Sequence, residues 1–192
     1  MKKILYGLTT AWLINIGLNA AEWTVDASHT EIGFSVKHMV ISKVNGKFTD
    51  YSGEILLDPQ NIEGARVKGV IKAASINTGN EARDNHLRSA DFFDVEKYPE
   101  ILFETVSIKK EGGRYKVVGN LTMHGVTKPI ELFATLAGPI KDPWGNERLG
   151  VEATGVLNRT EWGLTWDKVM ETGGLVVGHE VELKLAAELV RK

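Results

Sequence analysis

Residues 80–103 read Asn-Glu-Ala-Arg-Asp-Asn-His-Leu-Arg-Ser-Ala-Asp-Phe-Phe-Asp-Val-Glu-Lys-Tyr-Pro-Glu-Ile-Leu-Phe, and after residue 21 only this part of the chain has the pattern of a helix. Thr78 and Glu81 have the spacing of a capping box, so we expect the helix to begin near Thr78. The residues that recur at three- and four-residue spacing, and so define one buried face, are Ala82, His86, Leu87 and Ala90. Pro99 cannot continue a helix and favours an extended residue before it. We therefore predict a short helical insertion around residues 78–94 between two strands.

On both sides of this insertion the chain alternates apolar and polar residues, the period-two pattern of strands with one dry face. Gly112 and Gly113 separate two such runs, which predicts a hairpin. About eight strands joined by short turns favour an all-β fold, an antiparallel barrel, because closure removes exposed sheet edges. The predicted strands lie in residues 29–38, 46–57, 67–76, 101–109, 115–122, 130–136, 149–158 and 181–189.

The first 21 residues have the three-part layout of a secretory signal peptide. Lys2 and Lys3 precede an apolar run, residues 4–18, and cleavage is expected after Ala20 or Ala21. A membrane-anchoring helix is less favoured, because a span needs about 20 apolar residues and this run has roughly 15. The chain is therefore predicted to be exported, with residues 22–192 forming a single domain.

Composition excludes several classes of function. The 192 residues carry 23 basic and 25 acidic side chains, a formal net charge of -2, so a nucleic-acid partner is not indicated. There is no cysteine, which excludes disulfides and thiol chemistry. The alternation also suits an outer-membrane barrel, but such a barrel needs an apolar outer band with aromatic girdles, and here the aromatic residues are spread irregularly. We expect a soluble barrel without stable membrane insertion.

Four blocks in this order resemble the YceI-like family, and together they span nearly all of the chain after residue 21. The blocks are residues 26–38 (Asp-Ala-Ser-His-Thr-Glu-Ile-Gly-Phe-Ser-Val-Lys-His), 84–99, 119–129 and 158–164. Two departures are Thr30, where serine is commoner in the family, and Trp162, where phenylalanine is commoner. The resemblance implies an elongated, lipocalin-like barrel of eight antiparallel strands, usually exported, that holds a polyisoprenoid or similar long-chain amphiphile in an internal tunnel. It also implies a possible homodimer.

A barrel of eight strands either fills its interior with side chains or holds one slender ligand, and both alternatives stay open at this point. Glycines at 33, 69, 119 and 155 favour internal space, although bulges explain them equally well. The apolar residues that we expect to line a ligand cavity, each with ordinary core packing as its alternative, are Phe34, Val36, Phe48, Phe103, Leu121, Met123, Trp162, Leu164 and Leu183.

Cationic side chains near the helical insertion are candidates for contact with a ligand head group. They are Arg83, His86, Arg88 and Arg159. Arg88 and Arg159 have a competing structural role, which is to pair with Asp84, Asp91 or Asp94 and hold the insertion on the barrel.

The sequence predicts neither a metal site nor a cofactor, and no catalytic residues. Its five histidines lack the spacing of known metal sites, and there is no nucleophile elbow or phosphate-binding glycine loop. The leading hypothesis is a periplasmic carrier for an isoprenoid-like amphiphile rather than an enzyme. One alternative is an enzyme acting on an envelope isoprenoid or lipid, with His86 or His124 as acid or base. Another is a structural or stress-related envelope protein whose barrel is solid.

Overall fold

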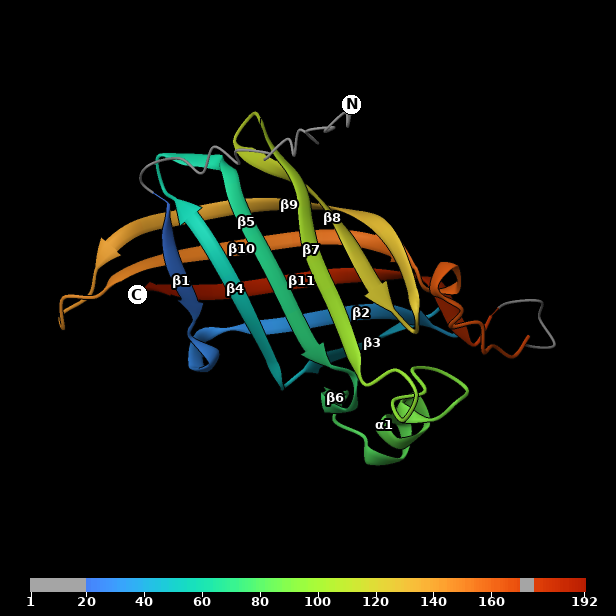
Figure 1. The fold of residues 1–192 in the computed structure, drawn as a ribbon. Helices are drawn as coiled ribbons and strands as arrows, with labels where there is room; N and C mark the ends of the chain where they lie inside the picture. The colour runs from blue at the N-terminus through green and yellow to red at the C-terminus, as the bar shows by residue number, and fades with distance from the viewer. Residues whose placement is uncertain (1–19, 170–174) are drawn as a thin grey trace, which may run out of the picture.

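The computed structural model describes residues 20–169 and 175–192 (Figure 1). The predicted signal peptide lies outside these residues except for Ala20 and Ala21, and Ala21 begins the first strand, β1 (Ala21–Val25). Among the described residues, no helix is both long enough and apolar enough to cross a membrane.

The strands close into a barrel. Eight of them follow one another in the order β1, β4, β5, β7, β8, β9, β10 and β11, and β11 then pairs with β1. All of these pairings are antiparallel, which confirms the predicted eight-stranded, lipocalin-like barrel. The further bounds are β4 (Tyr51–Asp58), β5 (Asn61–Lys72), β7 (Glu100–Glu111), β8 (Arg114–Met123), β9 (Val126–Lys141), β10 (Glu147–Asn158) and β11 (Val177–Arg191).

One edge of β11 is shared by two strands. Residues 23–25 of β1 pair with residues 189–191, and residues 31–36 of β2 (Glu31–His38) pair with residues 181–186. β2 then pairs with β3 (Ser42–Phe48), and β3 pairs with the short β6 (Ile76–Asn77). These three strands lengthen the wall beyond the closed ring, as the lower part of Figure 1 shows.

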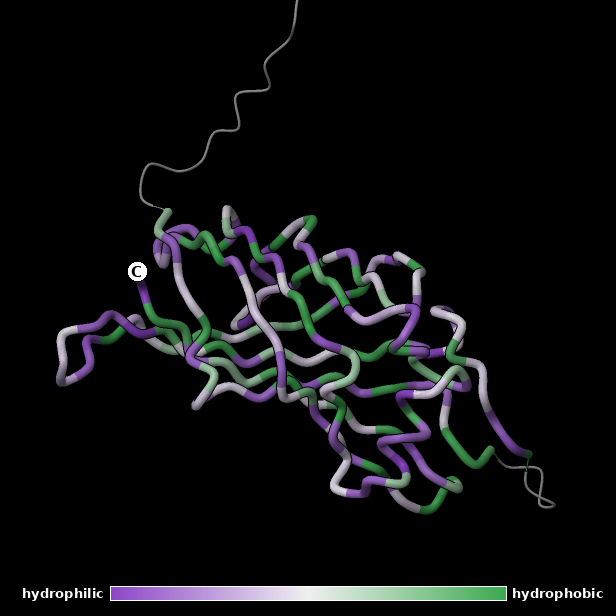
Figure 2. Tube along the Cα trace, turned by 60° about the horizontal axis from the view of Figure 1, so that its bottom comes forward, coloured by the Kyte–Doolittle hydropathy of each residue, from purple (hydrophilic) through white to green (hydrophobic). Residues whose placement is uncertain are grey.

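Inward-facing apolar side chains form two separate groups, one toward each end of the barrel. Trp23, 1% exposed, and Leu149, 2% exposed, belong to the group near β1. Ile76, fully buried, and Trp162, 2% exposed, belong to the group near β6. Figure 2 shows the accompanying alternation of hydrophobic and hydrophilic positions along the strands. Having two groups instead of one continuous core leaves room for a cavity between them.

The helix starts later than the sequence predicted. α1 spans Glu81–Arg88, and its N-cap is Asn80, whose side chain accepts a hydrogen bond from a backbone N–H of the first turn at 3.0 Å. The expected cap, Thr78, instead donates its hydroxyl to the buried carboxylate of Asp84 at 2.5 Å. Gly79 lies between the two candidate caps with φ +75, a conformation that glycine adopts without steric cost. This turn makes Asn80 the first residue able to cap the helix.

The helix also ends earlier than residue 94. After Arg88, the side chain of Ser89 turns back onto the last carbonyls of the helix, and Asp94 has φ +45, so turns replace helical structure. These turns direct Phe93 into the apolar group near β6, while Phe92 packs against His86 and Trp166. The segment is therefore a short helix followed by an apolar anchor that covers this end of the barrel (Figure 1).

A cluster of charges spans the interruption between β1 and β2. Arg148 Nη1 lies 2.8 Å from the carboxylate of Asp26 and 2.5 Å from that of Glu188, and its Nε lies 2.7 Å from Asp142. The four residues come from the end of β1, the β9–β10 loop, β10 and β11. Arg148 therefore connects the parts of the chain that meet where backbone pairing along β11 changes from one strand to the next.

These contacts change the acidity of two carboxyl groups. Hydrogen bonds from Ser28, His29 and Arg148 hold the pKa of Asp26 well below its usual value of 3.8. Burial alone would raise the pKa of Asp142, but hydrogen bonds from Arg148 and the following loop lower it overall. A carboxyl group whose pKa is lowered on folding stabilises the folded state above its unfolded pKa and loses that contribution as pH falls toward the lowered value.

We expect an Arg148→Met variant to be less stable than the wild type at pH 7 and the difference to shrink below about pH 4, where the unfolded carboxyl groups take up protons. Urea unfolding followed by circular dichroism at several pH values measures this. Lys68→Met is the control, because Lys68 and Glu104 form a pair in which both side chains are 62% exposed. Equal pH dependence in the Arg148 and Lys68 variants would contradict the assigned role.

Candidate ligand-binding cavity

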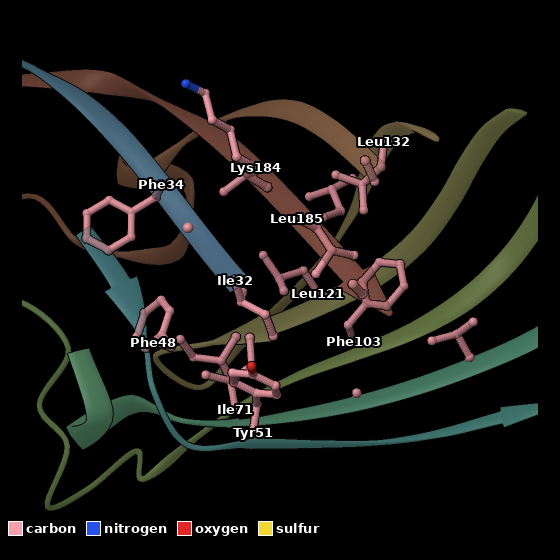
Figure 3. A pocket seen from close by; sticks show the side chains of 18 of the residues that line it. Ile32, Phe34, Phe48, Tyr51, Ile71, Phe103, Leu121, Leu132, Lys184 and Leu185 are labelled. Carbon is pink, nitrogen blue, oxygen red and sulfur yellow. The ribbon is translucent and has the colours of Figure 1, made fainter. Parts of the chain in front are cut away.

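An apolar cavity of about 380 Å³ runs inside the barrel between the two groups of buried side chains. Figure 3 shows Phe34, Phe103 and Leu185 among the side chains that surround it. Its volume falls in the lower part of the range of roughly 300–1,000 Å³ typical of ligand sites. The alternative of a solid barrel, left open by the sequence, is therefore not what the structure shows.

Most of the residues predicted to line a cavity do line this one. The predicted lining residues found in its wall are Phe34, Val36, Phe48, Phe103, Leu121, Met123, Leu164 and Leu183. Trp162 does not belong to the wall. It is 2% exposed and packs into the group near β6, where its Nε1–H donates to the carbonyl of Leu121 at 3.0 Å. Trp162 supports the wall from behind and contributes no surface to the cavity.

Some inward glycines make room for neighbouring side chains. A Cβ atom at Gly46 would lie 2.4 Å from the ring of Phe34, and one at Gly119 would lie 2.3 Å from the ring of Phe103. A Cβ atom at Gly155 would lie 2.6 Å from Leu132. The two phenyl rings thus rest over glycine backbone, which keeps them close to the wall and out of the centre of the cavity.

Gly53 and Gly69 have a different role, because neither the backbone nor a neighbour requires a glycine there. They are directly paired on β4 and β5, both line the cavity, and neither has a positive φ. The only atom near the Cβ position of Gly69 is Phe103 Cβ, at 3.9 Å, an ordinary van der Waals distance. Glycine weakens a strand, since it brings no side chain to pack. This pair of glycines therefore leaves part of the cavity wall without side chains.

Polar groups in the cavity wall have their hydrogen bonds satisfied within the protein. The hydroxyl of Tyr51 donates to the carbonyl of Thr30 at 2.7 Å, and burial raises the pKa of Tyr51. Thr105 accepts a hydrogen bond from the N–H of Val67 at 3.1 Å. Lys184 also borders the cavity, but its side chain is exposed and extends away from the other labelled side chains in Figure 3. The cavity wall therefore offers mainly apolar surface and few free polar groups.

Arg159 is the one predicted head-group residue in the cavity wall, and its donors are occupied. It is 4% exposed and donates to the carbonyls of Leu164, Trp166, Val177 and Gly178. Burial lowers its pKa, and Asp167, 3.7 Å away, opposes that effect. The expected pairing with Asp84, Asp91 or Asp94 is wrong, because Arg159 is directed to the backbone that leads into β11.

The other three head-group candidates lie in the α1 segment and not in the cavity wall. Arg83 donates to the hydroxyl and carbonyl of Thr78. Arg88 donates to the carbonyls of Ala74 and Ile76, at 2.8 and 2.9 Å, and so ties the helix to the chain before it. These guanidinium groups hold the helix in place over the end of the barrel.

His86 is part of an aromatic contact that the sequence did not indicate. Its ring lies edge-on to Trp166 at 4.9 Å and to Phe92 at 5.1 Å, and its Nε2 is 2.9 Å from Asp91. Trp166 belongs to the segment that Arg159 fixes, so this contact joins that segment to α1. No local signal near Trp166 marks it as a partner of residues so distant in sequence.

His124, the other histidine proposed as an acid or base, has a structural position at the β8–β9 turn. Its Nδ1 lies 3.1 Å from the carbonyl of Trp162, and its ring packs against Tyr98 at 4.6 Å. Neither His86 nor His124 is among the residues of the cavity wall.

Three potential metal ligands do approach one another outside the cavity. The ligand atoms of Asp26, His29 and Glu188 lie within 4.8 Å of each other. Both carboxylates also contact Arg148, whose positive charge offsets part of theirs. The cluster is accounted for as an ion-pair network.

The closed barrel and its apolar cavity define a protein of the lipocalin-like class. A family model, the YceI-like domain, matches residues 23–189, so the chain belongs to the YceI-like family. The UPF0312 protein plu2095 of Photorhabdus laumondii is 43% identical over 196 residues, which cover 100% of this chain and 99% of that protein.

Solved structures agree with this assignment. The YCEI protein of Campylobacter jejuni has a TM-score of 0.71 and 36% identity, covering 87% of this chain and 96% of its own. A polyisoprenoid binding domain from Saccharophagus degradans, implicated in plant cell wall breakdown, has a TM-score of 0.65, covering 90% and 99% of the two chains. At 16% identity, this second similarity shows the fold alone.

We expect Arg159→Met to lower the free energy of unfolding by about 3 kcal/mol, because it leaves several buried carbonyls without a donor. Urea unfolding measures the change. Arg66→Met is the matched control, since Arg66 is exposed on β5 and its replacement should cost less than about 0.5 kcal/mol. If the Arg159 variant were as stable as the control, the guanidinium would be available to a ligand after all.

Proposed function

We propose that this protein binds and carries a long-chain amphiphile, a polyisoprenoid in the first place, inside its barrel, and that it does so in the periplasm after export. The observation that carries the proposal is an apolar cavity whose wall has no side chain at Gly53 and Gly69. The similarity in fold to a polyisoprenoid binding domain supports the same ligand class. The signal-peptide pattern of residues 1–21 supports export.

The energetics favour a long hydrocarbon chain over a small ligand. Each buried methylene contributes about 0.8 kcal/mol, so about 15 of them contribute about 12 kcal/mol. Association costs on the order of 4 to 15 kcal/mol in lost freedom. Because the wall offers few polar partners, a short ligand cannot recover this cost through hydrogen bonds. A chain that follows the length of the barrel can recover it by apolar burial alone.

The placement of Arg159 limits the chemistry of the ligand. Its guanidinium donates to backbone carbonyls, and the other predicted cationic groups lie outside the wall. A buried anionic head would therefore remain without a partner, at a high cost in desolvation. We propose that the part of the ligand inside the cavity is uncharged and that any charged head group stays in contact with water.

The enzyme alternative has no observation in its favour. His86 and His124 are held by Asp91 and by the carbonyl of Trp162, respectively, and neither reaches the cavity wall. We therefore propose binding without chemical conversion. A homodimer stays a prediction from the family resemblance.

Gly69→Leu tests the proposal directly. A Cβ atom at Gly69 makes only an ordinary contact, 3.9 Å from Phe103 Cβ, and Gly69 lines the cavity. We therefore expect at least tenfold weaker binding of cis-parinaric acid, a long-chain fluorescent probe, and an unchanged or higher melting temperature. Val70→Leu is the matched control, because Val70 is the next residue on β5 and is not part of the cavity wall. Fluorescence titration of both variants measures the difference.

Equal probe affinity in the two variants would contradict binding in this cavity. Native mass spectrometry of the purified wild-type protein, followed by extraction and analysis of the retained lipid, would identify the natural ligand. We expect a retained polyisoprenoid mass in the wild type and a reduced amount in Gly69→Leu.

A further inference from the structure

The hairpin between β2 and β3 ends in three exposed apolar side chains. Met39 is 41% exposed, Val40 67% and Ile41 87%. The segment before β11 lies beside this hairpin, because Met39 N donates to the carbonyl of Val176 at 2.9 Å, and it carries Val169, which is 72% exposed. We call these four residues the apolar tip. The apolar tip places large hydrophobic side chains in contact with water at one end of the barrel, where polar side chains are usual.

The turn itself is unusual for such side chains. Met39 and Val40 have φ +49 and +66, and Ile41 N donates to the carbonyl of His38 at 3.3 Å. Asn and Gly adopt positive φ most readily, and a β-branched residue such as Val40 is strained there. The chain thus keeps apolar side chains at a place where both backbone strain and solubility favour their replacement. Strained residues that persist on a surface commonly serve a function.

The charges around the apolar tip suit an anionic surface. Lys37, Lys43 and Lys168 are exposed beside it, although Lys43 also pairs with Glu182 at 2.5 Å. Glu180 is a further exposed acidic neighbour. Asp167, next to Lys168, lies 3.7 Å from Arg159. Three lysines therefore stand beside the apolar tip against two glutamates, while the chain as a whole has a formal net charge of -2. Apolar side chains flanked by lysines are the combination that inserts into the interface of a bilayer containing anionic lipid.

The opposite hairpin tip, between β9 and β10, lacks this combination. Trp144 is 81% exposed there, but the positive φ of that turn falls on Gly145, so the backbone is not strained. The exposed cation of this tip is Lys141, the last residue of β9, and the neighbouring Ile140 is 63% exposed. Its exposed tryptophan makes this tip the natural comparison for an experiment.

The apolar tip is continuous with one end of the cavity. His38 pairs with Val177, and both Val177 and Val36 belong to the cavity wall. We propose that the apolar tip docks on an anionic lipid bilayer and thereby brings this end of the cavity to the membrane that contains the amphiphile. This inference rests on the proposed function, because a carrier of a water-insoluble chain must load and unload at a membrane.

Co-sedimentation with vesicles of phosphatidylglycerol and phosphatidylcholine tests the docking. We expect the wild type to bind these vesicles, to bind pure phosphatidylcholine vesicles at least tenfold more weakly, and to be released by high salt. In Met39→Asn/Val40→Gly the turn gains its preferred residues and loses two apolar side chains. This variant should therefore melt a few degrees higher and bind anionic vesicles at least tenfold more weakly.

Matched controls separate the apolar tip from general surface hydrophobicity. Val106→Asp changes an exposed valine on β7, 52% exposed, and Trp144→Asp changes the opposite tip, and both should bind vesicles as the wild type does. The proposal would be overturned if the wild-type protein did not bind anionic vesicles or if the Met39/Val40 variant still bound them. Loss of binding in Trp144→Asp alone would overturn it as well.

Probe titration without vesicles distinguishes this inference from the proposed function. The Met39/Val40 variant should bind cis-parinaric acid with unchanged affinity in solution while its transfer of the probe to anionic vesicles slows at least tenfold. Loss of probe affinity itself would count against the inference, because the apolar tip would then belong to the cavity and not to a docking surface.

Discussion

Backbone pairing along β11 is the constraint on which the rest of the structure depends. One edge of this strand pairs with β10, and the other edge pairs partly with β1 and partly with β2. Pairing with β1 closes the ring, and pairing with β2 extends the sheet beyond it. The division leaves residues 26–30 outside the ladder, and Arg148 occupies that place with contacts to Asp26 and Glu188. Closure pairs the backbone of β1 with that of β11, and Arg148 supplies ion pairs where the partner of β11 changes from β1 to β2.

Several polar groups near the cavity form hydrogen bonds within the protein. Arg159 donates to carbonyls that lead into β11, Tyr51 donates to Thr30, and Trp162 donates to Leu121. These bonds set the shape of the wall and leave little for a ligand to pair with. The arrangement supports the proposal that affinity comes from hydrocarbon burial, and it explains why the cationic residues of the α1 segment act on the fold and not on the cavity.

The sequence predicted the barrel well because strand alternation and the four family blocks are local signals. The same alternation predicted eight residues of the cavity wall, including Phe34, Phe103 and Leu183, although the wall contains many more. The alternation does not separate Trp162 from the wall residues, because a side chain buried behind the wall and one that lines the cavity give the same apolar pattern. Thr78 and Asn80 are both good caps, and the choice between them depends on the φ of Gly79. The partners of Arg159 are backbone carbonyl oxygens, which every residue has, so no pattern of side chains in the sequence predicts them.

The two kinds of inward glycine differ in how freely they can change over evolutionary time. At Gly119, a methyl group would collide with the ring of Phe103, so that position can change only together with its neighbour. Neither Gly53 nor Gly69 has a positive φ, and a Cβ atom at either position would have no neighbour closer than 3.4 Å, so each can gain a side chain in a single step. Related barrels can therefore acquire narrower or wider cavities through one codon at a time and without any change in topology.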